Sequence, residues 1–161
     1  MMTTHKFAAH STKLKVGEKA PAFFGIDQNG KNVTNNDFLG KTLILYFYPK
    51  DDTEGCTKES CSLRDEYLYL TDNNYDVVGV SADDENSHLK FANKYHLPFT
   101  LIADTKMEII NCYDVWGQKM LAGRIYDGIV RTTFIIDSKG FIKNIINSVD
   151  TAQHAKQILG L

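Results

Sequence analysis

The sequence is poor in cysteine and proline, and it has no long apolar run. Three cysteines among 161 residues are an odd number and too few for a disulfide scaffold. Thiols kept for chemistry are the better interpretation, and we expect a cytoplasmic protein. No apolar stretch approaches the ~20 residues that cross a bilayer. The formal net charge of -2 gives no electrostatic reason to expect nucleic acid or an anionic membrane as a partner.

The first stretch of the chain, "MMTTHKFAAHSTKLKVGEKAP", is polar and mildly basic. It lacks the apolar segment of a secretory signal. A short organelle-targeting segment is an alternative, although the stretch contains no arginine. We predict a flexible extension over residues 1–14 and a single domain over residues 15–161, since the length suits one hydrophobic core.

Strand and helix patterns alternate through the middle of the chain. The apolar run Thr42–Tyr48 is typical of a strand buried on both faces. Helical spacing follows it in residues 56–70, and further strand–helix pairs follow from about residue 77. Asn29-Gly30 predicts an early hairpin. After a loop over residues 116–130, a strand, a Ser-Lys-Gly turn, a second strand and a closing helix complete the pattern.

This order predicts an α/β protein with a central mixed sheet flanked by helices. We expect a thioredoxin-like fold with an N-terminal β-hairpin addition, and a closing hairpin that supplies antiparallel edge strands. In open α/β sheets, chemistry collects beyond the carboxyl ends of the strands. The loop after Tyr48 lies at such an end.

Cys56 lies in this region, in the first turn of the predicted helix. Free backbone N–H groups and the positive end of the helix dipole favour an anion there. A thiolate is such an anion, and it is the reactive form of cysteine. Nearby acidic residues oppose ionisation, so a positive charge is needed to offset them. An arginine brought in from elsewhere in the chain suits this purpose, because it stays charged and donates several hydrogen bonds.

Cys61 follows five positions later. In an α-helix this spacing places the two Cα atoms roughly 8 to 9 Å apart, beyond the ~7 Å limit for a disulfide. A bond between Cys56 and Cys61 therefore requires the helix start to unwind. The pair suits a cycle in which one thiol is oxidised and the other condenses with the sulfenic acid. On spacing alone, two small core residues remain an equal alternative.

The surrounding residues resemble a known family. "YFYPKDDTEGCTKESCSLRD" is similar to the peroxiredoxin signature P-x3-T-x2-C, here Pro49, Thr53 and Cys56. The C-x4-C pair followed by "LRDEY" resembles the bacterioferritin-comigratory, or peroxiredoxin Q, subfamily. Further similar segments extend along most of the chain: "KVGEKAPAF", "VVGVSAD", "FTLIAD", "YDVWGQK" and "GIVRTTFIID".

The resemblance implies a role for each matching residue. Cys56 is then the peroxidatic cysteine, and Cys61 resolves its sulfenic acid to an intramolecular disulfide. Thr53 holds the thiolate and the peroxide oxygen in line. Arg131 comes from a distant strand to favour the thiolate and to stabilise charge developing on the oxygens. Pro49 shields the pocket and shapes the loop.

The resemblance also implies a substrate and a reductant. The substrate is hydrogen peroxide or an organic hydroperoxide, and the reductant is thioredoxin or sometimes glutaredoxin. We expect a monomer, because resolution within one chain needs no partner. No metal, flavin or haem is needed, because a weak O–O bond requires a nucleophile, in-line positioning and donors. Glu54 departs from the pattern, since many members have proline there.

Two other functions remain as hypotheses. A disulfide oxidoreductase on the same scaffold is one, although the chain lacks the C-x2-C pair. A peroxide sensor or chaperone-like binder that changes shape on oxidation is the other.

Several other reactive or aromatic residues are assigned structural roles. Cys112 is predicted to be a small buried residue, with a secondary redox role as the alternative. The histidines show no metal-ligand spacing and are assigned to the surface or to helix packing: His5, His10, His88, His96 and His154. Core packing is expected for three aromatic residues that are alternative candidates for the substrate mouth: Phe91, Trp116 and Tyr126.

Overall fold

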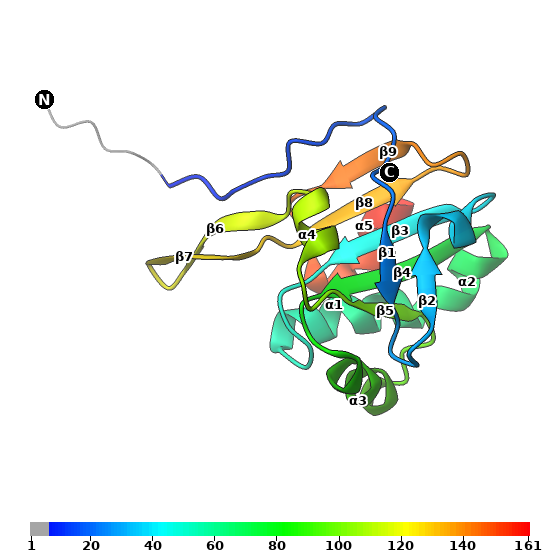
Figure 1. Ribbon diagram of the computed structural model, residues 1–161, viewed down its shortest axis with the longest axis horizontal. Helices are drawn as coiled ribbons and strands as arrows, with labels where there is room; N and C mark the ends of the chain where they lie inside the picture. Colours follow the sequence, from blue (N-terminus) through cyan, green and yellow to red (C-terminus); the bar gives the residue numbers. More distant parts are fainter. Residues whose placement is uncertain (1–6) are drawn as a thin grey trace, which may run out of the picture.

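A computed structural model describes residues 7–161 and contains a central five-stranded sheet (Figure 1). The strand order is β5-β4-β3-β8-β9. Strands β3, β4 and β5 are parallel, β8 runs antiparallel to β3, and β9 runs antiparallel to β8. The bounds are β3 (Thr42–Phe47), β4 (Tyr75–Ser81), β5 (Thr100–Ala103), β8 (Thr132–Ile136) and β9 (Ile142–Ile146). The predicted mixed sheet is confirmed, but of the two strands in the closing hairpin only β9 lies at an edge, and β8 lies between β3 and β9.

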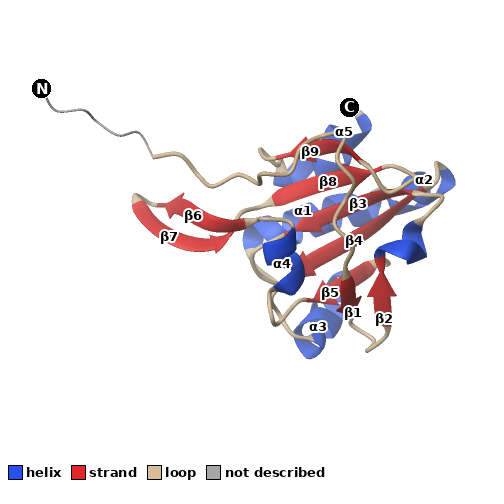
Figure 2. Cartoon of the chain, turned by 45° about the horizontal axis from the view of Figure 1, so that its top comes forward, coloured by secondary structure: helices blue, strands red, loops and turns tan. Residues whose placement is uncertain are grey.

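Helices and short strands cover the two faces of this sheet (Figure 2). One face packs against α1 (Glu54–Asp65), α2 (Tyr67–Asp72), α3 (Glu85–Tyr95) and α5 (His154–Leu159), which follows the 3-10 turn η2 (Thr151–Gln153). The other face packs against β1 (Phe24–Ile26), β2 (Asn32–Thr34), the 3-10 turn η1 (Asn35–Phe38) and α4 (Glu108–Cys112). The sheet is therefore the middle of three layers.

Alternating side chains of the central strands build two separate cores. In β3, Leu45 and Phe47 belong to the core under β1, β2 and α4, whereas Ile44 and Tyr46 belong to the core under the larger helices. All four side chains are fully buried. The continuous apolar run of this strand arises because both of its faces are covered.

The N-terminal hairpin forms where the sequence predicts it, with β1 and β2 paired antiparallel. Gly30 adopts a φ of 79°, which suits glycine in the connecting turn. The closing β8–β9 hairpin also forms, and Gly140 of its Ser-Lys-Gly turn has a φ of 91°. Both predicted turns are confirmed.

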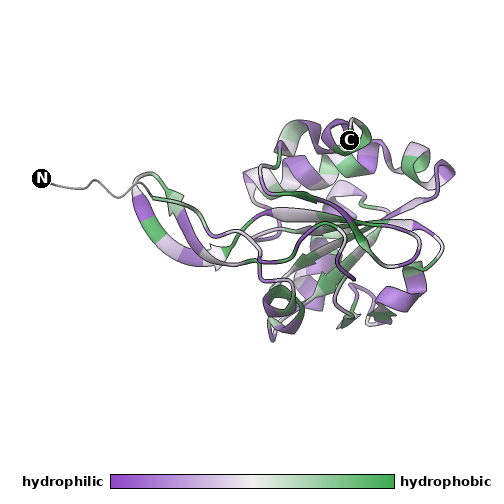
Figure 3. Cartoon of the chain, turned by 90° about the horizontal axis from the view of Figure 1, so that it is seen from above, coloured by the Kyte–Doolittle hydropathy of each residue, from purple (hydrophilic) through white to green (hydrophobic). Residues whose placement is uncertain are grey.

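A third hairpin replaces the loop expected over residues 116–130. Strands β6 (Trp116–Leu121) and β7 (Arg124–Ile129) pair antiparallel and extend away from the body (Figure 3). Ala122 and Gly123 have φ values of 52° and 77°. Positive φ at both central residues is typical of a two-residue hairpin turn whose twist matches that of the flanking strands. Most side chains of both strands are at least partly exposed, so cross-strand pairing rather than a buried face defines them.

The segment before residue 15 contacts the body of the protein at several points. The His10 backbone N–H donates to the Gln118 carbonyl at 3.0 Å. The Thr12 hydroxyl donates to the Tyr113 carbonyl at 2.7 Å. The predicted extension lies partly outside the described residues, so the division at residue 15 stays a prediction.

No helix among residues 7–161 is both long enough and apolar enough to cross a bilayer.

Candidate active site

Cys56 lies at the carboxyl end of β3 and near the start of α1. Thr53 is the N-cap residue, with extended backbone angles, and Cys56 follows in the first turn. The Cys56 side chain is only 1% exposed. The sulfur therefore lies beside the free N–H groups and the positive end of the helix dipole, where an anion is stabilised.

Arg131 makes the principal polar contact of this sulfur. Its Nη1 and Nη2 atoms each lie 3.4 Å from Cys56 Sγ. Arg131 immediately precedes β8, and the first residue of β8, Thr132, pairs with Phe47 at the end of β3. Because these two strands are neighbours in the sheet, a residue 75 positions away along the chain meets the loop that follows β3.

Gly55 allows this close approach. A Cβ atom at Gly55 would lie 3.1 Å from Arg131 Nη2, which is tighter than an ordinary van der Waals contact. The missing side chain leaves room for the guanidinium beside the first turn of α1.

Glu59 forms a second contact with Arg131 that the sequence interpretation did not identify. Arg131 Nη1 donates to Glu59 Oε1 at 2.8 Å, and the Glu59 side chain is fully buried. Burial raises the pKa of Glu59 to about 7, although the charge of Arg131 acts in the opposite direction. A glutamate on an amphipathic helix usually faces solvent. The position of Glu59 in the sequence therefore did not indicate that its side chain is buried beside Arg131.

His154 at the start of α5 lies on the far side of Glu59. Its Nε2 atom is 3.5 Å from Glu59 Oε2 and 2.8 Å from Thr133 Oγ1. The ring is fully buried. Burial lowers the pKa of His154, and the charge of Arg131 acts in the same direction.

Pro49 and Thr53 lie in the segment between β3 and Cys56, and among the described residues neither forms a hydrogen bond with the sulfur. The exposed Thr53 hydroxyl donates to the Lys50 carbonyl at 2.8 Å. Pro49 is half-buried directly after β3. The side chain of Glu54, the residue that departs from the family pattern, is exposed and accepts a hydrogen bond from Lys58. Its negative charge is therefore directed to solvent.

Cys61 lies in the same continuous helix as Cys56 and is half-buried. Burial raises the pKa of the Cys61 thiol, with a smaller contribution from Asp65 in the same direction. All three cysteines are free thiols in the structure. Cys112, at the end of α4, is exposed, so the prediction that it is buried is wrong.

A buried hydrogen-bond network holds the loop between β3 and α1 against α3. The Asp51 carboxylate accepts from the Tyr48 hydroxyl at 2.6 Å and from the Ser87 hydroxyl at 2.8 Å. His88 Nδ1 lies 2.7 Å from Asp51 Oδ2, and His88 Nε2 lies 2.9 Å from the Ile102 carbonyl. Because both oxygens can accept, these contacts favour the protonated ring, which carries a hydrogen on each nitrogen. Burial acts to lower the pKa of His88, but Asp51 and Ile102 together raise it.

One group of metal-ligand side chains occurs among the described residues: Asp51, Asp83 and His88. One ligand atom from each lies within 4.8 Å of the others. The Asp83 carboxylate also accepts from the Ser81 hydroxyl and the Asp51 backbone N–H. These atoms thus already serve the network that fixes the loop.

The histidine and aromatic assignments have mixed outcomes. His88 and His154 are buried within helices, and His96 is exposed at the end of α3, as expected. His5 lies outside the described residues. Phe91 is a core residue, whereas Trp116 and Tyr126 are 40% and 41% exposed on the projecting hairpin. The expectation that these two aromatic residues pack in the core is wrong.

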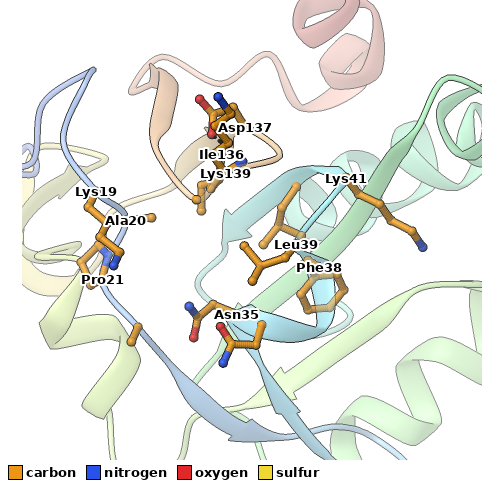
Figure 4. A pocket seen from close by; sticks show the side chains of 14 residues that line it. Lys19, Ala20, Pro21, Asn35, Phe38, Leu39, Lys41, Ile136, Asp137 and Lys139 are labelled. Atoms are coloured by element: carbon orange, nitrogen blue, oxygen red, sulfur yellow. Dashed lines mark hydrogen bonds between the residues drawn. The ribbon is translucent and has the colours of Figure 1, made fainter.

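A separate cavity lies elsewhere, at the amino end of β3. Its volume is about 620 Å³. Figure 4 shows side chains from the N-terminal segment, η1 and the β8–β9 turn around it. Its lining includes Lys19, Phe38, Lys41, Leu43 and Asp137. Because Cys56 follows the opposite end of β3, the reactive sulfur does not belong to this cavity.

Comparisons with known proteins agree with this geometry. The model of the AhpC/TSA family matches residues 16–145. Peroxiredoxin Bcp of Escherichia coli is 40% identical over 91% of this chain and 94% of its own. Peroxiredoxin Bcp of Bacillus subtilis is 37% identical over 91% and 93%. A peroxiredoxin Q mutant from Xanthomonas campestris superposes with a TM-score of 0.79 at 30% identity, over 86% of this chain and 88% of its own.

A buried cysteine at a helix start beside an arginine, on a thioredoxin-like sheet, defines a thiol-dependent oxidoreductase. The chain belongs to the AhpC/TSA family, and its relatives and structural neighbours place it among the Bcp and PrxQ peroxiredoxins. It is therefore a thiol peroxidase that uses a peroxidatic cysteine and a disulfide intermediate. The predicted family, fold class and enzyme class are confirmed.

Proposed function

We propose that Cys56 is the peroxidatic cysteine and that it reduces hydrogen peroxide and organic hydroperoxides. The observation that carries this assignment is the double contact of Arg131 with Cys56 Sγ, at 3.4 Å from each terminal nitrogen. A guanidinium in this position stabilises the thiolate, which is the attacking species. A structure of the Xanthomonas campestris bacterioferritin comigratory protein, 28% identical with a TM-score of 0.81, was described for its alkyl peroxide reduction activity.

The proposed first step breaks the peroxide bond. The Cys56 thiolate attacks one oxygen, an S–O bond forms and the O–O bond breaks. The departing alkoxide or hydroxide takes up a proton and leaves as an alcohol or water. Arg131 stabilises the charge that moves from sulfur to oxygen. Thr53 aligns the peroxide once its hydroxyl turns from the Lys50 carbonyl, and Pro49 limits access of water.

Cys61 completes the proposed cycle. Its thiol condenses with the Cys56 sulfenic acid, a disulfide forms and water leaves. Thioredoxin, or a glutaredoxin, then returns two electrons and two protons through its own dithiol. The cycle takes place in the cytoplasm, where thiols stay reduced. A monomer suffices, because both cysteines lie on one helix.

Two measurements test this proposal. Cys56→Ser should abolish peroxide consumption; a variant that keeps the wild-type rate contradicts the assignment. Mass mapping without reduction, after one equivalent of peroxide, should find a bond between Cys56 and Cys61. A bond that includes Cys112 instead assigns resolution to another thiol.

A further inference from the structure

Behind Arg131 lies a buried acid–base pair, Glu59 on α1 and His154 on α5, that the proposed steps do not use. Glu59 Oε2 lies 3.5 Å from His154 Nε2, and both side chains are fully buried. Over residues 7–161, Oε2 is the one buried side-chain nitrogen or oxygen without a hydrogen-bond partner. A buried carboxylate oxygen that accepts no hydrogen is unfavourable. The energy of this pair therefore depends on whether Glu59 or His154 carries the proton.

The neighbours of His154 fix its tautomer. The Gln157 side chain donates through Nε2 to the Ser148 carbonyl at 2.8 Å, and its Oε1 accepts the Asp150 backbone N–H at 3.0 Å. Oε1 is thus an acceptor, and His154 Nδ1, 2.9 Å away, must carry a hydrogen. In a neutral ring, Nε2 is then an acceptor whose single lone pair accepts from the Thr133 hydroxyl, while Glu59 Oε2 lies 3.5 Å away.

A neutral His154 disfavours an ionised Glu59. The partly negative Nε2 atom and a charged Oε2 would lie 3.5 Å apart in a fully buried site. A protonated Glu59 removes this repulsion. The raised pKa of Glu59, about 7, and the lowered pKa of His154 agree with this arrangement.

The proton on Glu59 decides how the charge of Arg131 is used. The guanidinium contacts both Cys56 Sγ and Glu59 Oε1. With one buried positive charge, the pocket favours one anion over two. It holds either a thiolate beside protonated Glu59 or a thiol beside ionised Glu59.

We propose that His154 is a positioning residue for the peroxidase reaction: it keeps one proton on Glu59 and so leaves the charge of Arg131 to the Cys56 thiolate. This inference rests on the proposed role of Cys56. Other titratable groups act on the same cluster from neighbouring elements: Tyr46 from β3, Lys119 from β6 and Asp150 before η2. These groups are present in every variant below, so their effects cancel in the comparison.

The test is a double-mutant cycle in a chain whose other two cysteines are replaced by serine, so that the thiolate absorbance reports Cys56 alone. His154→Phe removes the ring nitrogens while keeping a buried ring. It should raise the midpoint of the Cys56 titration by about one pH unit, the scale of a nearby charge. In a Glu59→Gln background, where position 59 stays neutral, the same change should produce less than a third of that shift.

Three outcomes overturn the inference: no shift with His154→Phe, equal shifts in both backgrounds, or a Glu59 that is already ionised at pH 6. Equal shifts indicate a purely structural role for His154. Infrared difference spectra between the single-cysteine chain and its Glu59→Gln variant test the third outcome, and they can still overturn the inference if His154→Phe does not fold. A protonated carboxyl band should be present at pH 6 and disappear near pH 7. If Cys56 of the unmodified chain does not react with peroxide, the proposed function itself fails.

Discussion

At the scale of single residues, Arg131 carries one positive charge and donates hydrogen bonds to two acceptors. Its geometry depends on a planar fork that reaches Cys56 and Glu59 together. A lysine carries the same charge on a single nitrogen and cannot reproduce this arrangement.

Arg131→Lys should therefore slow the oxidation of Cys56 while the fold persists. Loss of a hydrogen bond to a charged group costs about 1.5–3 kcal/mol, which corresponds to roughly 10- to 150-fold in rate. Stopped-flow measurement with hydrogen peroxide gives the rate constant. Arg124→Lys, at an exposed position on the projecting hairpin, is the matched control and should leave the rate unchanged. An Arg131→Lys enzyme as fast as this control contradicts the role of the guanidinium.

Gly55→Ala should have different effects on the stability of α1 and on the position of the Arg131 guanidinium. Alanine favours a helix interior over glycine by about 1 kcal/mol, and part of this gain applies in the first turn of α1, so the melting temperature should hold or rise. The added Cβ, 3.1 Å from Arg131 Nη2, should displace the guanidinium by a few tenths of an ångström and slow Cys56 oxidation. Calorimetry and stopped-flow kinetics on the same sample check both effects. Unchanged kinetics show that the guanidinium tolerates the shift.

At the scale of elements, α1 carries both proposed redox cysteines and must change shape during the cycle. In the reduced structure it is continuous from Glu54 to Asp65. The contacts that hold it include the Arg131–Glu59 pair and the Ala155 N–H, which donates to Ser62 Oγ at 3.1 Å. Formation of the disulfide must unwind part of α1, because helical geometry keeps Cys56 and Cys61 apart.

Cys61→Ser should uncouple the two halves of the cycle. One fast turnover with peroxide should remain, since Cys56 and Arg131 are untouched, but recycling by thioredoxin should be lost. A single-turnover assay and a thioredoxin-coupled steady-state assay measure the two halves. Cys112→Ser, at the exposed end of α4, is the control and should keep both. An undiminished steady-state rate in Cys61→Ser shows that another thiol resolves the sulfenic acid.

The elements also show what sequence patterns can and cannot predict. β3 and α1 were predictable because burial on two faces, or on one helical face, leaves a periodic pattern. The β6–β7 hairpin was not, because most of its side chains are at least partly exposed and its pairing depends on the opposite strand. The residues of the candidate site differ in the same respect. Cys56, Cys61 and Arg131 were predicted from the motif and its resemblance to a known family. Glu59 and His154 are brought together only by the packing of α5 against α1.

At the scale of the whole molecule, buried titratable groups link stability to pH. Glu59 binds a proton more tightly in the folded chain, with a pKa of about 7 against an ordinary 4.5. Its contribution is fully present below about pH 4.5 and is lost as pH rises to about 7. His88, whose pKa is raised by Asp51 and Ile102, contributes stability below its ordinary 6.5 that is lost as pH rises through its higher folded value.

The contributions of Glu59 and His88 should accordingly decrease between pH 5 and pH 8, whereas His154, whose pKa is lowered by burial, contributes a smaller change in the opposite direction. For Glu59 alone, the shift corresponds to a loss on the order of 3 kcal/mol of unfolding free energy. Urea denaturation at several pH values measures the slope, and Glu59→Gln should flatten it because glutamine binds no proton. Asp65→Asn, which removes an exposed carboxylate from the same helix, is the control and should leave the slope unchanged. If Glu59→Gln keeps the wild-type slope, Glu59 does not bind the proton that couples folding to pH.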